Sequence, residues 1–193
     1  MKGEIISREF VRPLPSGHEL KYLFQTFEFV LKGKDSLDRY LKTCYESGVP
    51  ELAEIESASQ CRTPVAKVKQ IKNHPLIELA KEADYRGRGY KQHSIVQNYL
   101  LANDRATIAT EVPLFMTADE TPNGKNWGGH LDILRIENNK FQIIDFKPKA
   151  NKEKWAGSQV LRYMLMFSGR TAIPLDLIEG IYFDDEFAFS VNF

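Results

Sequence analysis

The sequence predicts an α/β fold: a small mixed β-sheet flanked by helices and preceded by an N-terminal helical region. Apolar residues recur with helical spacing over residues 35–101, whereas β-branched and apolar residues are concentrated in residues 107–147 and again in 178–189. Residues 155–168 lie between these strand-rich stretches and have the pattern of a helix. Helices before and between strands predict helical layers packed around one sheet.

Length and composition limit the function classes. A chain of 193 residues suits one domain with a substantial core, and we expect residues 1–84 to pack on a core made by residues 85–193. Basic and acidic residues number 26 each, so the net charge indicates no polyanionic partner. No apolar run approaches the roughly 20 residues of a membrane span, and the first residues lack the apolar stretch of a secretory signal. We expect a soluble cytoplasmic protein without a membrane partner.

The first part of the chain gives the least regular pattern. Residues 5–11 favour a short strand, and residues 19–31 fit either a strand or a buried helix. We expect a helix to start at Asp35, a favourable N-cap residue, and to end near Gly48. Three following segments begin with proline, which is common in the first turn of a helix. They predict short helices at residues 50–59, 64–73 and 75–84, and a further helix follows at residues 90–102.

A strand and a hairpin follow the helical region. Residues 107–115 have the composition of a strand, and residues 128–136 and 140–147 form two more with apolar alternation. Asn138 and Asn139 separate the last two strands. Asparagine pairs suit the positive φ angles of a two-residue hairpin turn, so the sequence predicts a β-hairpin with a defined register.

This register places like charges opposite each other. When Asn138 and Asn139 form the loop, counting back along both strands brings Asp132 opposite Asp145. His130 then lies opposite Lys147. Facing residues have Cβ atoms about 5 Å apart, and like charges at that distance are destabilising. An isolated Asp–Lys pair is usually a surface ion pair, but two facing carboxylates beside a lysine require a compensating cation.

Glu111 adds a third carboxylate if the loop at residues 116–127 closes symmetrically, because Glu111 then meets Asp132. Three carboxylates on adjacent strands form a hard-oxygen site for Mg²⁺ or Mn²⁺, which also bind substrate phosphate. Such a metal activates water and neutralises charge on a phosphodiester. Lys147 lies on the same hairpin face as Asp145 and is expected to orient the water or to stabilise the developing negative charge.

The order of these residues resembles a known family. Asp132, followed after an apolar strand by Asp145 and Lys147, is similar to the PD-(D/E)XK nuclease signature. The next helix carries Gln159 and Tyr163, which resemble the third motif of the RecB-like branch. That branch includes CRISPR-associated and AddAB-type exonucleases.

The resemblance covers about residues 85–170 and implies a restriction-endonuclease-like core. It also implies that Glu111 and His93 join Asp132 and Asp145 as metal ligands, although a helical histidine at this position is equally well explained as a surface or core residue. Many RecB-like nucleases hold an iron–sulfur cluster on four cysteines. This chain has two cysteines and does not fit that subgroup.

Four residues near the hairpin are candidate substrate contacts. Gln159 and Tyr163 are four residues apart and share one helix face, so we expect them to position substrate, with core packing as the alternative for Tyr163. Lys149 and Arg162 belong to a basic cluster that would bind phosphates without reading bases. Such clusters are also common as solvated surface.

The sequence therefore predicts a Mg²⁺- or Mn²⁺-dependent nuclease acting on DNA, as a single strand or a duplex end. Its catalytic residues would be Asp132, Asp145, Lys147 and Glu111, and exonuclease action follows from the resemblance. Because no helicase motif is present, a helicase or other recombination or replication partner would be a separate chain. Two alternatives stay open: a non-catalytic nucleic-acid-binding or scaffold protein with a nuclease-like fold, and an enzyme acting on another phosphate ester.

Overall fold

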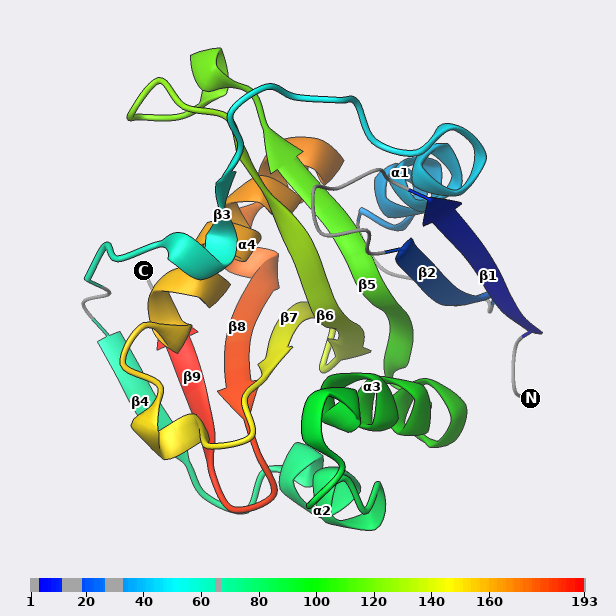
Figure 1. Cartoon of the computed structure of the whole chain (residues 1–193), viewed down its shortest axis with the longest axis vertical. Coiled ribbons are helices and arrows are strands. Elements are labelled where there is room, and N and C mark those ends of the chain that lie inside the picture. Colours follow the sequence, from blue (N-terminus) through cyan, green and yellow to red (C-terminus); the bar gives the residue numbers. More distant parts are fainter. Residues whose placement is uncertain (1–3, 12–18, 27–32, 65–66, 193) are drawn as a thin grey trace.

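The described residues form one mixed β-sheet with helices on both of its faces (Figure 1). The computed structural model describes residues 4–11, 19–26, 33–64 and 67–192. The strands are β1 (Glu4–Val11), β2 (Glu19–Thr26), β3 (Glu56–Ser57), β4 (Lys67–Ile71), β5 (Thr107–Met116), β6 (Trp127–Glu137), β7 (Lys140–Phe146), β8 (Ile178–Phe183) and β9 (Ala188–Asn192). The α-helices are α1 (Lys34–Ser47), α2 (Pro75–Glu82), α3 (Gln92–Asn103) and α4 (Ala156–Thr171).

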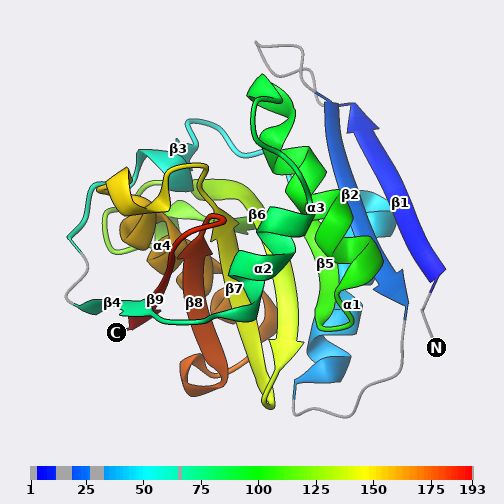
Figure 2. The same cartoon turned by 90° about the horizontal axis from the view of Figure 1, so that it is seen from below.

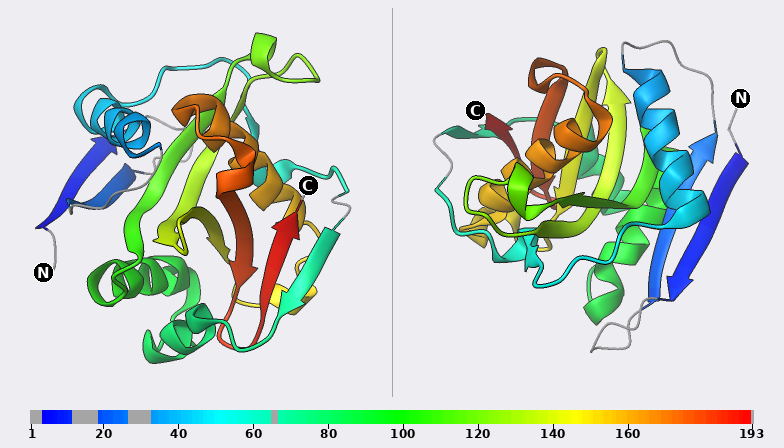
Figure 3. Two further views of the ribbon diagram at one scale, coloured as in Figure 1. Left: turned by 180° about the vertical axis from the view of Figure 1, so that it is seen from behind. Right: turned by 90° about the horizontal axis from the view of Figure 1, so that it is seen from above.

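The strand order in the described part of the sheet is β1-β2-β5-β6-β7-β8-β9-β4, with β3 pairing separately with β6. Most neighbours are antiparallel, whereas β7–β8 and β3–β6 are parallel, so the sheet is mixed as predicted. The parallel step from β7 to β8 requires a crossover, and α4 supplies it. Figure 2 shows α2 and α3 on one side of the sheet and α1 on the other, and Figure 3 shows α4 on the same side as α1.

The two faces of the sheet bury separate apolar clusters because neighbouring residues of a strand point to opposite sides. Leu134 and Ile143 pack in the cluster that contains α4, together with Phe167. Ile133 and Ile144 pack in the cluster that contains α2 and α3. The hairpin is therefore the centre of the fold and is covered on both sides.

Gly180 allows α4 to lie very close to β8. A Cβ atom at this position would be 2.5 Å from Sδ of Met164 and 2.6 Å from Cγ1 of Val160, both on α4. A side chain there would push the helix away from the sheet. Because α4 also carries Gln159, this contact fixes the height of the helix above the carboxyl end of β7.

Two predicted helices are wrong. The segment at 50–59 contains only the short strand β3 and the start of a 3₁₀ turn, and 67–71 is the edge strand β4 paired with β9. Lys67 and Lys69 alternate with Val68, a period of two that the proline-based expectation overlooked. Pro50 and Pro64, which start these two segments, lie outside any helix.

The amino-terminal region is richer in strand than predicted. β1 and β2 extend the sheet beyond β5. Of the segment 19–31, for which the sequence left strand and helix open, residues 19–26 are a strand. Residues 27–31 lie outside the described part of the chain. The expected helix near Asp35 is present, but Gly33 occupies its N-cap position. The helices expected at 75–84, 90–102 and 155–168 are confirmed as α2, α3 and α4. None of the described helices is long and apolar enough to cross a membrane.

Candidate functional site

The predicted hairpin register is confirmed from the turn to the pair of Ile133 and Ile144. Asn138 and Asn139 have φ angles of 51° and 59°, the left-handed values that a type I′ turn requires. The paired residues run from Glu137 opposite Lys140 to Ile133 opposite Ile144. Asp132 and Asp145 are the next position, directly beyond the last pair of the ladder.

Beyond the end of the backbone ladder, the side chain of Asp132 provides the next hydrogen bond between β6 and β7. Its Oδ2 atom accepts a hydrogen bond of 2.9 Å from the backbone N–H of Phe146. The next backbone N–H, that of Lys147, donates across the sheet to Phe183 on β8 at 2.9 Å. The end of β7 therefore stays attached to both neighbouring strands, and its carboxylate and ammonium groups are held in place.

Asp145 is a buried carboxylate, and one of its two oxygens accepts no hydrogen bond of adequate geometry from the described residues. Only 1% of the residue is exposed, and Oδ1 accepts a hydrogen bond of 3.2 Å from Nε2 of Gln159. Nζ of Lys147 lies 2.7 Å from Oδ2, but Oδ2 receives no hydrogen bond of adequate geometry from the described residues. Burial, reinforced by the charge of Asp132, raises the pKa of Asp145 to about 7 in spite of the ammonium. A second positive charge beside Oδ2 would offset the cost of ionising Asp145 in this buried position.

Gln159 is itself held by Tyr163. The same Nε2 atom of Gln159 lies 3.2 Å from the hydroxyl oxygen of Tyr163, one helical turn later on α4. Tyr163 is buried, and its ring occupies space that is free only because residue 129 is glycine: a Cβ there would be 2.9 Å from Cε1 of Tyr163. Tyr163 thus packs in the core and also acts as a positioning residue for Asp145 through Gln159.

Glu111 lies on β5 at the predicted position but in a strained backbone. Thr110 faces Ile133 and Val112 faces Leu131, which brings Glu111 to the level of Asp132. Its φ of 53° is uncommon for a residue with a side chain, and such strain is typically retained at functional sites. Burial first, and the charge of Asp132 second, raise the pKa of Glu111, although Gln97 of α3 donates a short hydrogen bond to it.

His93 reaches the site from the opposite helical layer. Its Nδ1 atom lies 3.2 Å from Oδ2 of Asp132, and its ring packs edge-on against Phe146 with centroids 5.2 Å apart. Burial tends to lower the pKa of His93, but the carboxylate of Asp132 outweighs it, so the net shift is upward. In this structure the imidazole is therefore a partner of Asp132.

Comparisons with known proteins found no match: no protein-family model, no curated protein and no solved structure is similar to the chain. The resemblance to PD-(D/E)XK nucleases therefore remains a prediction from the sequence. The chemistry of the site follows from the side chains that the fold brings together.

Part of the predicted ligand set fits a divalent cation. Among the described residues no three His, Cys, Asp or Glu side chains form one group suited to a metal ion. Asp132 and Asp145 nevertheless follow the last pair of the β6–β7 ladder. Oδ2 of Asp145 is a buried oxygen that forms an ion pair with Lys147 but accepts no hydrogen bond of adequate geometry from the described residues. Glu111 and His93 are engaged by Gln97 and Asp132. The two aspartates are thus the residues that would hold a Mg²⁺ or Mn²⁺ ion.

The two predicted phosphate contacts differ in their surroundings. Arg162 is only 5% exposed, forms a 2.8 Å ion pair with Glu56 and lies over the ring of Trp127. The guanidinium fixes β3 to α4, so we do not include Arg162 among the substrate contacts. Lys149 is exposed two residues beyond Lys147, at the start of a 3₁₀ turn.

Two polar residues that support the site were not predicted. Gln97, which binds Glu111, lies four residues after His93 on the same face of α3, and this spacing was a usable signal. Asp184 accepts a 2.8 Å hydrogen bond from the backbone N–H of Ala150 and so anchors the segment after Lys147. Asp184 follows β8, far from Lys147 in the sequence, and no local pattern indicates this contact.

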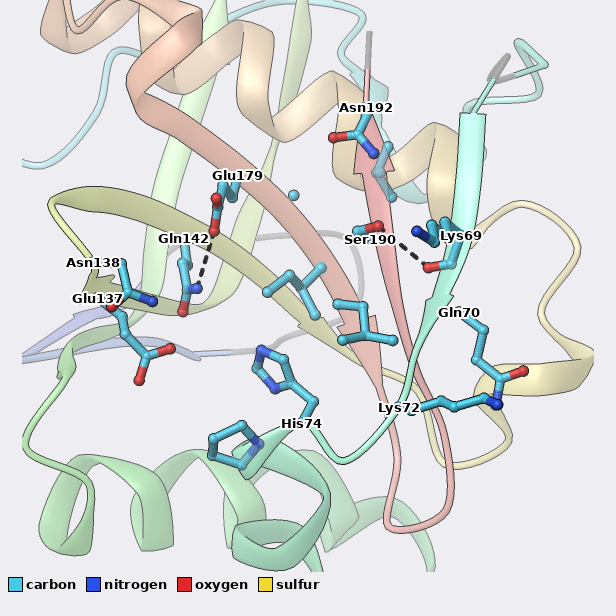
Figure 4. Close-up of a pocket in the computed structure, with 15 residues that line it drawn as sticks. Lys69, Gln70, Lys72, His74, Glu137, Asn138, Gln142, Glu179, Ser190 and Asn192 are labelled. Atoms are coloured by element: carbon cyan, nitrogen blue, oxygen red, sulfur yellow. Dashed lines mark hydrogen bonds between the residues drawn. The ribbon is translucent and has the colours of Figure 1, made fainter.

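A separate pocket lies at the other end of β7, near the hairpin turn (Figure 4). Its volume is about 800 Å³, and its polar lining includes Lys69, His74, Glu137 and Glu179. Nδ1 of His74 accepts a hydrogen bond from the backbone of Leu76 and caps α2, and burial lowers the pKa of this imidazole. The pocket shares no residue with the Asp132–Asp145 site.

Proposed function

We propose that the protein is a metal-dependent nuclease that hydrolyses phosphodiester bonds in DNA, built on a restriction-endonuclease-like core. The observation that carries this proposal is the pair Asp132 and Asp145, two carboxylates buried together at the end of the β6–β7 ladder with the ammonium of Lys147 beside them. Such a pair is unfavourable in the absence of a cation and is suited to holding one.

The reaction adds water across one P–O ester bond and leaves a phosphate monoester and a hydroxyl end. A divalent cation held by Asp132 and Asp145 would lower the pKa of water and neutralise charge on the phosphodiester. Burial opposes the charge on Lys147, but the carboxylates outweigh it and raise the pKa of its ammonium group, which stays protonated. Lys147 is therefore available to donate a hydrogen bond to a phosphate oxygen as negative charge develops on it.

The surrounding residues orient the reacting groups. Gln159 holds Oδ1 of Asp145 and leaves Oδ2 directed toward Lys147. His93 and the backbone of Phe146 share Oδ2 of Asp132, which fixes that carboxylate from the opposite helical layer. These contacts reduce the motion of the carboxylates, and such restriction is how an enzyme keeps reacting groups in productive geometry.

A cleavage assay tests the proposal. End-labelled single-stranded and duplex DNA are incubated with the protein in Mg²⁺, Mn²⁺ or EDTA. We expect metal-dependent cleavage that falls by at least about a hundredfold in Asp145→Asn and in Lys147→Ala. Lys140→Ala removes a lysine from the other end of β7 and should leave the rate unchanged. Mononucleotides released from an end would indicate an exonuclease, and absence of cleavage in every metal would refute the proposal.

A second candidate is a nucleic-acid-binding or scaffold protein without activity. It is favoured by the contacts that the two carboxylates already make within the protein, with Lys147 and Gln159 at Asp145 and with His93 at Asp132. This candidate predicts binding of DNA that is insensitive to EDTA and to Asp145→Asn, without cleavage under any condition. The same samples therefore distinguish the two functions.

A further inference from the structure

A second hollow adjoins Asp145, on the α4 side of the sheet. We call it the Trp155 pocket; its volume is about 600 Å³, within the range of about 300–1,000 Å³ that is usual for ligand pockets. Its lining includes the side chains of Val68, Lys152, Lys154, Trp155, Tyr182 and Phe189. In Figure 1 the segment between β7 and α4 runs beside β9 and β4, where this pocket lies.

The pocket is lined by direct neighbours of the proposed catalytic residues. Tyr182 on β8 is the register partner of Asp145 on β7, so the two are direct neighbours in the sheet. Ser158, which also lines the pocket, immediately precedes Gln159, the hydrogen-bond partner of Asp145. A molecule in the pocket would therefore contact residues that are direct neighbours of Asp145 and Gln159.

Three aromatic side chains line the pocket, those of Trp155, Tyr182 and Phe189. The rings of Tyr182 and Phe189 are stacked with centroids 4.8 Å apart and an interplanar angle of 15°. Phe187 continues this stack beyond Phe189, with centroids 6.3 Å apart. Val68 on the edge strand β4 is 43% exposed and adds an apolar side chain to the pocket. These surfaces suit a planar, largely apolar ligand.

Positive charges surround the aromatic surface. Nζ of Lys154 lies 4.9 Å from the centroid of the Trp155 ring, and the guanidinium of Arg62 lies 5.9 Å from it. Lys152 also lines the pocket, where Glu153 supplies one opposing charge. Cations beside stacked rings are the combination that binds single-stranded nucleic acid, because the bases stack while the phosphates pair with the cations.

We propose that the Trp155 pocket binds one unpaired nucleobase of the strand whose phosphodiester lies at Asp145. This inference rests on the proposed nuclease function and adds a substrate requirement to it: the nucleotide beside the reacting phosphate must be unpaired. Single strands and frayed ends meet this requirement, whereas a closed duplex must first be opened at a cost of a few kcal/mol. The pocket thus selects the form of the nucleic acid and does not depend on its sequence.

The wall of the pocket is held in place for this role. The hydroxyl of Ser158 donates a short hydrogen bond to the backbone carbonyl of Thr63, next to Pro64 on the pocket rim. On the other side, Asp184 holds the backbone of Ala150, which also lines the pocket. These contacts attach one wall to α4, which carries Gln159, and the other wall to the end of β8.

Binding of short oligodeoxythymidine, followed by anisotropy of a dye on the oligonucleotide in EDTA, tests the inference separately from catalysis. Trp155→Leu and Phe189→Leu should each weaken binding by about tenfold or more, the effect of losing one stacked base. Tyr90→Ala removes an aromatic ring that is 92% exposed outside the pocket and serves as the matched control, with affinity unchanged. Lys147→Ala should abolish cleavage and retain tight binding.

The outcomes separate the two proposals. Equal affinity of Trp155→Leu, Phe189→Leu and the wild type would overturn the pocket, whether or not the protein cleaves DNA. Tight binding that depends on Trp155, without cleavage in any metal, would support the pocket and refute the nuclease. In an active protein, an abasic nucleotide scanned along the substrate should suppress cleavage at one fixed offset from the lesion, and uniform cleavage along the scan would contradict base capture.

Discussion

Replacing Gly129 with alanine tests the link between Tyr163, Gln159 and Asp145. The new Cβ atom would lie 2.9 Å from Cε1 and 3.2 Å from the hydroxyl oxygen of Tyr163. It would also lie 3.3 Å from Cβ of Ala58, so the added methyl group has no direction in which to relax freely. The tyrosine ring must therefore move.

The size of the effect follows from these distances. Carbon atoms pack at about 3.5–4.0 Å, so the ring of Tyr163 must shift by about 0.6 Å or more. The hydroxyl of Tyr163 now lies 3.2 Å from Nε2 of Gln159, and a hydrogen bond is lost at about 3.6 Å. We expect Gly129→Ala to lower the free energy of unfolding by about 1–3 kcal/mol, as overpacking of a core does. We expect a fall in cleavage rate of about a hundredfold through the displaced Asp145.

Urea unfolding followed by circular dichroism gives the stability, and the DNA cleavage assay gives the rate. Gly169→Ala is the matched control, because its Cβ would meet only the side chain of Met116 at 3.8 Å. An exposed helical glycine replaced by alanine should gain up to about 1 kcal/mol and keep full activity. Unchanged stability and rate in Gly129→Ala would refute the proposed contact between Tyr163 and the strand.

Other predictions concern the sheet and its ion pairs. Gly180→Ala should lower the midpoint of urea unfolding, because α4 cannot move from β8 without disturbing the core; a midpoint equal to wild type would contradict this packing. Burial opposes the charge on Asp104, but the guanidinium of Arg135, which is 2% exposed, outweighs it and holds the pKa of that carboxyl below its ordinary value. Because the pKa of Asp104 is lower in the folded than in the unfolded protein, the Asp104–Arg135 pair stabilises the fold above about pH 4. This stabilisation is lost as the pH falls through the folded-state pKa of Asp104, and thermal unfolding measured from pH 7 downward tests it. Asp104→Asn should remove this pH dependence and about 3 kcal/mol of stability at pH 7, while Glu46→Gln, in an exposed pair, should change stability by less than about 1 kcal/mol.

The central hairpin was predictable because its constraints are local. A two-residue turn at Asn138 and Asn139 and a period of two fix which residues face each other, and the structure has that register. The pairing that brings Glu111 to the level of Asp132 also follows from a loop that closes symmetrically. The neighbourhood of the carboxylates was therefore predictable from the sequence. Two supporting residues were not predicted: Gln97, which donates to Glu111, and Asp184, which holds the backbone of Ala150.

The errors concern residues whose structure depends on distant parts of the chain. The edge strand β4 exists because β9 offers it a partner, and β9 lies more than a hundred residues later in the sequence. Arg162 has the sequence context of a surface residue, yet its guanidinium is buried and pairs with the partly exposed Glu56 of β3. Proline positions and charge runs carry no information about such tertiary contacts.

Binding of Mn²⁺ tests most directly the central claim that Asp132 and Asp145 hold a divalent cation. The electron paramagnetic resonance signal of free Mn²⁺ is followed as the protein is added, and Mg²⁺ is then added as a competitor. We predict one Mn²⁺ site that Mg²⁺ displaces and that is lost in Asp132→Asn and in Asp145→Asn. Glu137→Gln, at the turn end of the same hairpin, should bind as the wild type does. Full Mn²⁺ binding by Asp145→Asn, or none by the wild type, would contradict the claim.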